Sequence, residues 1–264
     1  LSYGIVNEFY EYSIESRFID RSKRFKKKLF CHILCSSIII WIKIGGPILK
    51  NRNLKLQIIL LLVIAILSGC FSRPEEKIHK KLEEVVKLEE DFKNEQKPLI
   101  KLEEKEKKLY EQIIELGYKE HDKLIALADE AIEVSNQRQE HLNEEKKSIV
   151  TASEKFESVK NQIDKLESSQ LKKDGQELYA IMEKRYKVYH QLYAEYSKAT
   201  KKDKKLYEAF KDKNMTLEKL QEKIDEINQA YEQVYLLNDQ FNELTKKYNK
   251  KKLAFYRKAG LIKK

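Results

Sequence analysis

The sequence from Leu217 to Tyr248 reads LEKLQEKIDEINQAYEQVYLLNDQFNELTKKY. Its apolar residues stand three, four or seven positions apart, at Leu217, Leu220, Ile224, Ile227, Tyr231, Val234, Phe241 and Tyr248. Side chains at these spacings share one face of a helix, and a sustained repeat of seven winds neighbouring helices around each other. The stretch is therefore predicted to be one long helix that buries a single stripe against other helices.

Stripes of the same kind fill the chain from Pro74 onward. One runs from Ile78 to Phe92 and resumes from Leu99 to Leu116, and another runs from Leu124 to Leu166. The composition agrees, because 36% of the residues are charged and the 264 residues include only seven glycines and three prolines. This is the balance of long, solvent-washed helices. The fold class is predicted to be all-α.

Turn signals divide this region into four helices, at about 74–116, 119–167, 175–211 and 216–258. Each is roughly 37 to 49 residues, or about 55 to 75 Å, long. Near-equal helices joined by short loops favour an elongated up-and-down four-helix bundle with coiled-coil-like packing. Pro98 either kinks the first helix or turns the chain. We favour the kink, because a turn would leave two short helices without partners of matching length.

Three capping signals mark the turns between these helices. Gly117 is suited to a helix C-cap, and Asp174 with Glu177 has the spacing of a capping box. Asn214 or Thr216 can cap the final helix. Three polar residues interrupt the second stripe: Ser135, Arg138 and Glu145. They either fix the helix register through buried polar contacts or mark the entry of a partner helix or ligand, and we favour register.

A tetrapeptide ahead of the helices predicts where the protein is located. Leu67, Ser68, Gly69 and Cys70 close the apolar run Leu56–Ile66, which follows Lys50, Arg52 and Lys55. A positive segment, an apolar run of about 11 residues and small residues are typical of a signal peptide. The run is too short for a membrane span, which needs about 20 residues. The tetrapeptide is interpreted as a lipobox, with cleavage before Cys70 and a membrane lipid on its thiol.

The domain prediction follows from this cleavage site. Residues 49–69 are the lipoprotein signal peptide, and 70–264 form the helical bundle with a basic C-terminal tail. Residues 1–48 are expected to reflect a mis-assigned start, because the chain begins with Leu1 and Leu49 would open an ordinary signal peptide. The alternative is a genuine transmembrane helix in the apolar run Leu29–Ile42.

The charge of the chain does not indicate nucleic acid as a partner. The whole chain has a net charge of +10, but residues 71–264 contain 42 basic and 39 acidic residues. No RRM, zinc-finger or helix-turn-helix signature accompanies them. Most of the basic excess therefore lies before Cys70, in the part expected to be removed. Within residues 71–264, basic residues gather at the C-terminus, where residues 246–264 contain no acidic residue. The basic residues of this tail are Lys246, Lys247, Lys250, Lys251, Lys252, Arg257, Lys258, Lys263 and Lys264.

An even number of helical passes returns this tail to the end of the bundle that follows Cys70. The tail would then lie beside the anionic membrane surface and the polyphosphate polymers anchored there. Each basic residue contributes on the order of 1 kcal/mol near such a surface, screened by salt. The tail residues are therefore candidate contacts to a polyanion or to the membrane surface.

Tyrosines repeat every seven residues in the third helix, at Tyr179, Tyr186 and Tyr193. Such a stripe either stacks on the sugar rings of a glycan or packs in the core, and we favour packing. The histidines of residues 71–264 form no His-x-x-x-His pair, and no nucleophile or carboxylate-pair motif appears. We expect no catalytic residue, no metal site and no cofactor.

The chain resembles the YkyA-type cell-wall-binding lipoproteins of Bacillus-like and Staphylococcus-like bacteria. The likeness covers about residues 50–264 and is carried by the lipobox and by four runs: LYEQIIELG at 109–117, RYKVY at 185–189, TLEKL at 216–220 and FYRKAGL at 255–261. It implies a lipid-anchored helical bundle and supplies no catalytic residues.

These observations lead to a functional hypothesis. The protein is expected to be a non-enzymatic lipoprotein, held by Cys70 on the extracytoplasmic face of a Gram-positive cell membrane, that binds peptidoglycan or teichoic acid. One alternative is a helical adaptor or assembly factor for an envelope protein complex. A wall-modifying enzyme is the third hypothesis, and it predicts turnover of peptidoglycan.

Overall fold

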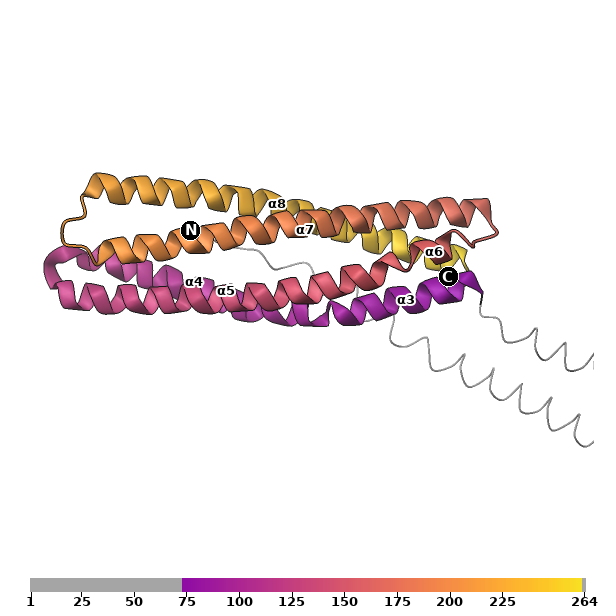
Figure 1. Cartoon of the computed structure of the whole chain (residues 1–264), viewed down its shortest axis with the longest axis horizontal. Helices are drawn as coiled ribbons and strands as arrows, with labels where there is room; N and C mark the ends of the chain where they lie inside the picture. The colour runs from indigo at the N-terminus through magenta and orange to yellow at the C-terminus, as the bar shows by residue number, and fades with distance from the viewer. Residues whose placement is uncertain (1–72, 263–264) are drawn as a thin grey trace, which may run out of the picture. The chain divides into compact units, whose positions relative to one another are not determined.

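The computed structural model describes residues 73–262, apart from the side chains at 118 and 119, and this range contains helices but no strand. The elements are α3 (Pro74–Leu88), α4 (Glu90–Leu116), the 3-10 helix η2 (Gly117–Glu120), α5 (His121–Glu157), α6 (Lys160–Ile163), α7 (Ser169–Phe210) and α8 (Leu217–Lys258). They make four antiparallel passes, the first formed by α3 and α4 together (Figure 1). The prediction of an all-α up-and-down four-helix bundle is confirmed.

Two of the predicted helix ends carry residues with cap chemistry. Gly117 follows α4 with φ at +59° and donates its backbone N–H to Ile113. Thr216 caps α8, since its hydroxyl accepts from the backbone N–H of Lys219 at 3.3 Å. Both caps agree with the prediction.

The predicted start of the third helix at residue 175 is wrong, because α7 begins at Ser169. The Ser168 hydroxyl accepts from the backbone N–H of Leu171 at 3.3 Å and so caps α7 six residues earlier than the capping box we expected. Gly175 lies inside the helix and is buried against Ile163. A Cβ atom at this position would lie 3.2 Å from two carbons of Ile163. Here glycine serves close helix packing, and it does not end a turn.

The first pass is interrupted at Glu89, between α3 and α4. The hydroxyl of Ser148, on α5, accepts from the backbone N–H of Phe92 at 3.1 Å and donates to the carbonyl of Leu88 at 2.6 Å. A side chain inserted between a residue and its partner four positions earlier is a recognised cause of a helix kink. Pro98 lies inside α4, which continues through it. A kink at Pro98 stays a prediction.

Replacing Ser148 with alanine is expected to lower the free energy of unfolding by about 1–3 kcal/mol, because the backbone groups of Leu88 and Phe92 lose their shared partner. Urea unfolding followed by circular dichroism measures the change. Ser153→Ala is the matched control, since Ser153 lies on the same helix outside this bridge, and we expect less than about 0.5 kcal/mol for it. Equal losses for the two variants would contradict the bridging role.

The core joins all four passes through aromatic rings. Phe92 on α4 lies 5.6 Å from Tyr189 on α7 and 5.7 Å from Phe241 on α8, between ring centres. Tyr189 and Phe241 are 5.7 Å apart. These separations are those of favourable edge-to-face aromatic contacts. Phe156 contributes a further buried ring from α5.

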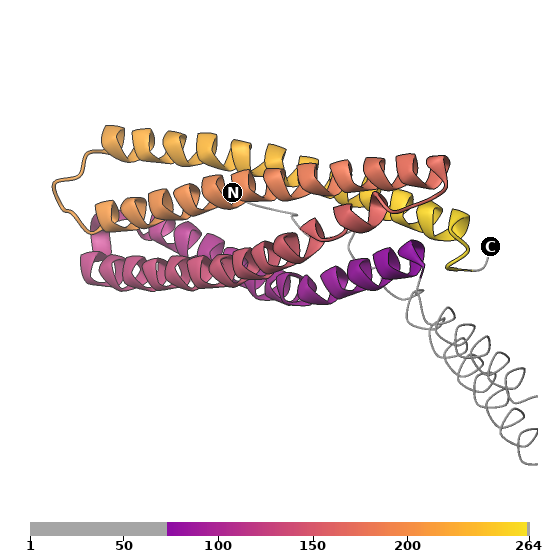
Figure 2. The same ribbon diagram turned by 45° about the vertical axis from the view of Figure 1, so that its right-hand side comes forward.

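The end of α8 lies beside the beginning of α3 (Figure 2). The Tyr256 hydroxyl donates to the Glu83 carboxylate at 3.1 Å, and the Tyr256 ring lies 4.6 Å from the ring of His79. We call this end of the bundle, formed by the start of α3, the start of α7 and the end of α8, the Pro74 end. The predicted return of the C-terminal helix is confirmed for the described residues.

The signal peptide predicted at 49–69, Cys70 and the segment 1–48 lie outside the described residues. Within 73–262, none of the helices combines the length and apolar character that crossing a membrane requires. No group of three metal-ligating side chains is arranged to hold an ion in this same range.

Candidate binding groove between α5 and α7

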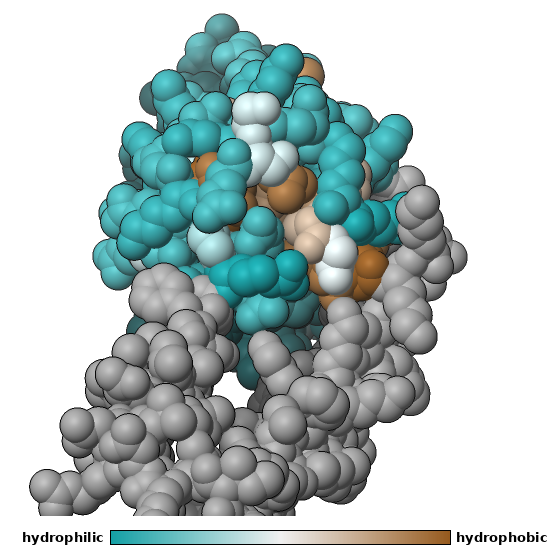
Figure 3. Space-filling model, turned by 90° about the vertical axis from the view of Figure 1, so that its right-hand side faces the viewer, coloured by the Kyte–Doolittle hydropathy of each residue, from teal (hydrophilic) through white to brown (hydrophobic). Residues whose placement is uncertain are grey.

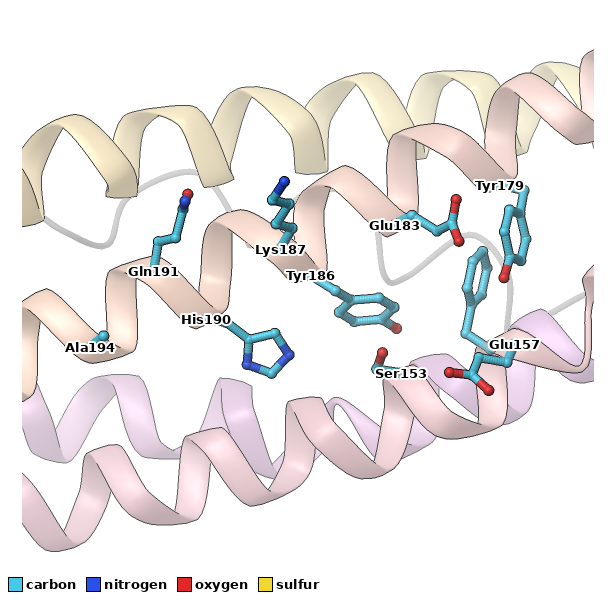
Figure 4. A pocket seen from close by; sticks show the side chains of 10 residues that line it. Ser153, Glu157, Tyr179, Glu183, Tyr186, Lys187, His190, Gln191 and Ala194 are labelled. Carbon is cyan, nitrogen blue, oxygen red and sulfur yellow. The ribbon is translucent and has the colours of Figure 1, made fainter.

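A groove of about 510 Å³ opens between α5 and α7 (Figure 4). We call it the α5–α7 groove. Three of its lining residues come from α5 and seven from α7: Ser153, Phe156, Glu157, Tyr179, Glu183, Tyr186, Lys187, His190, Gln191 and Ala194. The groove is therefore mainly a feature of the tyrosine-rich α7.

Short side chains leave the space that the groove occupies. Ser153 on α5 and Ala194 on α7 both line it. Tyr186 and His190 project from α7 toward α5 on either side of this space (Figure 4). Tyr179 and Tyr186 share a face of α7 because seven residues correspond to about two helical turns. The sequence thus places the tyrosine rings toward one end of the groove and His190 and Gln191 toward the other.

The aromatic end is held rigid by three rings. Phe156 stacks on Tyr179, with ring centres 5.0 Å apart and an interplanar angle of 14°. It also contacts Tyr186 edge to face at 5.9 Å. Phe156 is 2% exposed and Tyr186 is 4% exposed, whereas Tyr179 is half-buried. The ring that a ligand can reach is therefore that of Tyr179.

Both groove tyrosines carry uncharged hydroxyls. Burial raises the pKa of Tyr186 far above its ordinary value, and its hydroxyl donates to Glu89 at 2.9 Å. Partial burial also raises the pKa of Tyr179, with a further contribution from the neighbouring carboxylate of Glu183. At neutral pH both phenols therefore act as hydrogen-bond donors.

Charged and polar side chains surround the rings at the surface. Glu157, Glu183, Lys187, His190 and Gln191 are all exposed. The two carboxylates lie close enough to Tyr179 to raise its pKa. The rim therefore offers both donors and acceptors, with negative charge at the aromatic end.

Tyr193 does not line the groove, although it continues the repeat of Tyr179 and Tyr186. Its hydroxyl donates to Asn143 at 2.8 Å, and the Lys146 ammonium lies 4.4 Å from its ring centre. The predicted stripe is thus divided: Tyr186 is packed, Tyr179 is half-buried in the groove, and Tyr193 is half-buried outside it.

The basic tail lies at the Pro74 end, where hydrophilic side chains surround a small apolar area (Figure 3). Lys251 pairs with Glu177 at 2.8 Å and Lys258 pairs with Asp174 at 2.6 Å, so both join α8 to α7. Lys252 is half-buried, and burial lowers its pKa. Lys246 lies 3.6 Å from Glu243.

Contact between the remaining tail residues and a polyanion or the membrane surface stays a prediction. Lys247, Lys250 and Arg257 are exposed. Lys263 and Lys264 lie outside the described residues. Lys247, Lys250 and Arg257 are therefore the described tail residues that we retain as candidate contacts to a polyanion.

Arg138 is the centre of a buried polar network that touches all four passes. Its guanidinium donates to Glu106 of α4 at 2.5 Å, to Asp203 of α7 at 3.3 Å and to Tyr231 of α8 at 2.8 Å. The side chain is 2% exposed. Tyr196 accepts from it as well, at 3.0 Å. One cation on α5 thus fixes the relative positions of the helices around it.

The other two polar interruptions are buried as well. The Ser135 hydroxyl donates to Glu106 at 3.0 Å, within the Arg138 network. Glu145 accepts a hydrogen bond from Gln96, and its burial raises its pKa well above the ordinary value. The buried polar contacts predicted for Ser135, Arg138 and Glu145 are confirmed.

A second buried arginine was not predicted. Arg185 donates to Glu89 at 2.8 Å and to the Thr245 hydroxyl at 2.8 Å, so it joins α7 to α8 beside the break in the first pass. The burial of Arg185 could have been predicted from the spacing of apolar residues. Arg185 stands three residues after Met182 and four before Tyr189, in the buried row of α7.

The described residues define the class of the protein: an all-helical rod with an open, aromatic-lined groove on one side. A family model described as "YkyA: Putative cell-wall binding lipoprotein" matches residues 73–258, and the chain belongs to this family. The resemblance inferred from the lipobox and the helical runs is thereby confirmed.

Two relatives support the family and the fold. The chain is 36% identical over 196 residues to the "Uncharacterized lipoprotein YkyA" of Bacillus subtilis strain 168, covering 74% of this chain and 88% of that protein. It also superposes, with a TM-score of 0.62, on the 1.6 Å crystal structure of a conserved protein of unknown function from Staphylococcus aureus. That match is 21% identical and covers 71% of this chain and 99% of the other, so it supports the fold alone.

Proposed function

We propose that the protein is a lipid-anchored surface lipoprotein that binds the cell wall, and that it acts by binding without catalysis. The lipobox at 67–70 supports the anchor, and the description of the family supports the wall as the partner. The observation that carries the proposal is the position of the basic tail beside the start of α3.

The Pro74 end, beside which the tail lies, is separated from the proposed anchor by only a few residues. Cys70 precedes Pro74 by four residues, which reach at most about 14 Å when fully extended. A lipid on Cys70 would hold the Pro74 end within that reach of the outer surface of the membrane. Lys247, Lys250 and Arg257 would then face the anionic lipids and the anionic polymers rooted in the same surface.

Electrostatic attraction of this kind depends on salt. Exposed charges interact over about 8 Å at physiological ionic strength, and each basic residue near an anionic surface contributes about 1 kcal/mol. Lys251 and Lys258 are already paired with carboxylates of α7, so they contribute less than the three exposed cations. Binding through the tail should therefore weaken as salt is added.

The test is retention of the detergent-purified full chain on isolated cell walls, with and without teichoic acid. We expect retention at low salt, which falls when Lys247, Lys250 and Arg257 are all replaced by glutamate. A matched control carries glutamate at Lys201, Lys205 and Lys219, which are exposed and lie away from the Pro74 end. The control changes the net charge equally and should be retained like the parent. If the parent chain is retained on neither wall at low salt, the proposal is wrong.

A helical adaptor for an envelope protein complex is the second candidate function. Large apolar side chains exposed on the bundle favour it: Ile114 is 51% exposed, Leu217 79% and Leu236 55%. Isolated apolar residues are common on protein surfaces, so this observation is weaker than the position of the tail. Crosslinking in cells from position 217 would give one dominant protein partner if the adaptor function holds.

A further inference from the structure

We propose that the α5–α7 groove is a saccharide site, in which an uncharged hexosamine ring of a glycan strand stacks on Tyr179. The inference rests on the proposed wall-binding function for the source of the glycan. It concerns a different part of the bundle from the basic tail, and it assigns the groove a ligand of its own.

The groove presents the two kinds of surface that a sugar ring needs. A pyranose ring has an apolar face of C–H groups and an edge of hydroxyl groups. Phe156 covers one face of the half-buried Tyr179 ring, so the opposite face supplies the apolar surface, with the exposed carboxylate of Glu183 near it as a hydrogen-bonding partner. His190 and Gln191 lie about 16–18 Å further along α7 and would meet later sugars of the strand. A few polar groups around an aromatic surface are typical of small-ligand sites.

Tyr179 is already held in position. Phe156 stacks on it at 5.0 Å, and Tyr186 packs against Phe156 at 5.9 Å. The Tyr186 hydroxyl is in turn fixed by Glu89 at 2.9 Å. A platform fixed before binding loses little side-chain freedom when the ligand arrives, and this favours affinity.

The charges at the aromatic end select against a polyphosphate. Glu157 and Glu183 are the charged lining residues whose carboxylates act on Tyr179, and both carry negative charge. A phosphate placed on Tyr179 would be repelled by both. Lys187 is the cation that lines the groove, and Lys160 lies 5.9 Å from the Tyr179 ring centre. An uncharged sugar therefore fits this end better than teichoic acid does.

The shape of the groove suits a linear chain. The α7 residues that line it run from Tyr179 to Ala194, which corresponds to about 22 Å along the helix. The groove is open along the side of the bundle (Figure 4). A partner helix would need a continuous apolar stripe, whereas most of the lining side chains here are polar or charged.

The test is isothermal titration calorimetry of the detergent-solubilised full chain with a tetrasaccharide of N-acetylglucosamine and, separately, with poly(glycerol phosphate). We expect the parent chain to bind the tetrasaccharide. Tyr179→Ala should weaken that binding by about tenfold, the loss typical of one stacked ring contact. Tyr179→Phe keeps the ring and should bind within about twofold of the parent.

Tyr193→Ala is the matched control, because it removes the same side chain from the same helix outside the groove. Its affinity should equal that of the parent. Thermal melting of each variant checks that the bundle is intact. Absence of tetrasaccharide binding by the parent, an equal loss in Tyr193→Ala, or a loss in Tyr179→Phe as large as in Tyr179→Ala would each overturn the inference.

Failure of this inference can be told apart from failure of the proposed function. The triple glutamate variant of the tail should still bind the tetrasaccharide. If the tetrasaccharide does not bind while walls still retain the chain through its tail, the saccharide site alone is wrong. Crosslinking from position 183 to a protein in cells, in place of glycan, would also overturn it.

Discussion

Replacing Arg138 with methionine is expected to lower the free energy of unfolding by about 3–5 kcal/mol. The guanidinium is the shared partner of Glu106 and Asp203, and Glu103 lies 3.8 Å from it as well. All three carboxylates are less than one-tenth exposed. Removing the cation would leave them buried without a counter-charge, which costs more than the loss of the ion pairs themselves. Urea unfolding at pH 7.5 measures the change.

Two controls separate charge burial from loss of packing. Arg257→Met removes an exposed arginine and should change the free energy of unfolding by less than about 0.5 kcal/mol. Combining Arg138→Met with Glu106→Gln and Asp203→Asn should recover much of the loss, because only Glu103, of the three carboxylates, would then keep a negative charge. A loss below about 1 kcal/mol in the single variant would show that water or rearrangement satisfies the carboxylates.

Asp203→Asn is expected to make the bundle more stable at alkaline pH and less sensitive to pH. Burial, followed by the negative charge of Glu106, raises the pKa of Asp203 to about 7, although Arg138 acts in the opposite direction. In the unfolded chain the pKa of an aspartate is near 3.9. The folded state therefore binds this proton more tightly than the unfolded state.

The sign of the pH dependence follows from this difference. Below pH 4 both states are protonated and the contribution to stability is complete, and it is lost as the pH rises toward 7. A shift of about 3 pKa units corresponds to about 4 kcal/mol. Asparagine can still accept from Arg138 and Tyr231, as Asp203 does. The variant should therefore match the parent near pH 4 and exceed it by up to about 4 kcal/mol at pH 8.

Urea unfolding at pH 4, 6 and 8 measures this difference. Asp239→Asn, on the exposed face of α8, is the control and should follow the pH profile of the parent. The groups that face Asp203 are Glu106 from α4, Arg138 from α5 and Tyr231 from α8, and its pKa belongs to this network as a whole. Equal stability differences at pH 4 and pH 8 would show that folding does not raise the pKa of Asp203.

The four passes were predictable because apolar spacing is a local property of each helix. The stripe of Leu217–Tyr248 is buried at most of its positions, including Ile227, Val234 and Phe241, although Leu217 itself is exposed. The buried polar contacts could also be predicted, since Arg138 occupies a position where an apolar residue was expected. The spacing could not predict which residues of the other helices these side chains would contact.

Features that depend on register between helices were not predicted. The break at Glu89 is made by Ser148, which lies on a different helix and more than fifty residues away. The groove requires Ser153 of α5 to lie beside Tyr186 of α7 (Figure 4), and nothing in either local sequence indicates it. The seven-residue spacing of Tyr179, Tyr186 and Tyr193 gave no reason to separate them. Only the packing of α5 against α7 places the first two in the groove and leaves the third outside it.

The break at Glu89 has a mechanical consequence for an anchored protein. If Cys70 holds the chain to the membrane while the bundle is attached to the wall, any tension between the two layers enters the bundle through α3. This helix has 15 residues and is separated from α4 at Glu89. It would therefore be the first helix to bear the load, and the buried contacts of Ile78, Leu82 and Val85 would have to break before the load could pull it from the bundle.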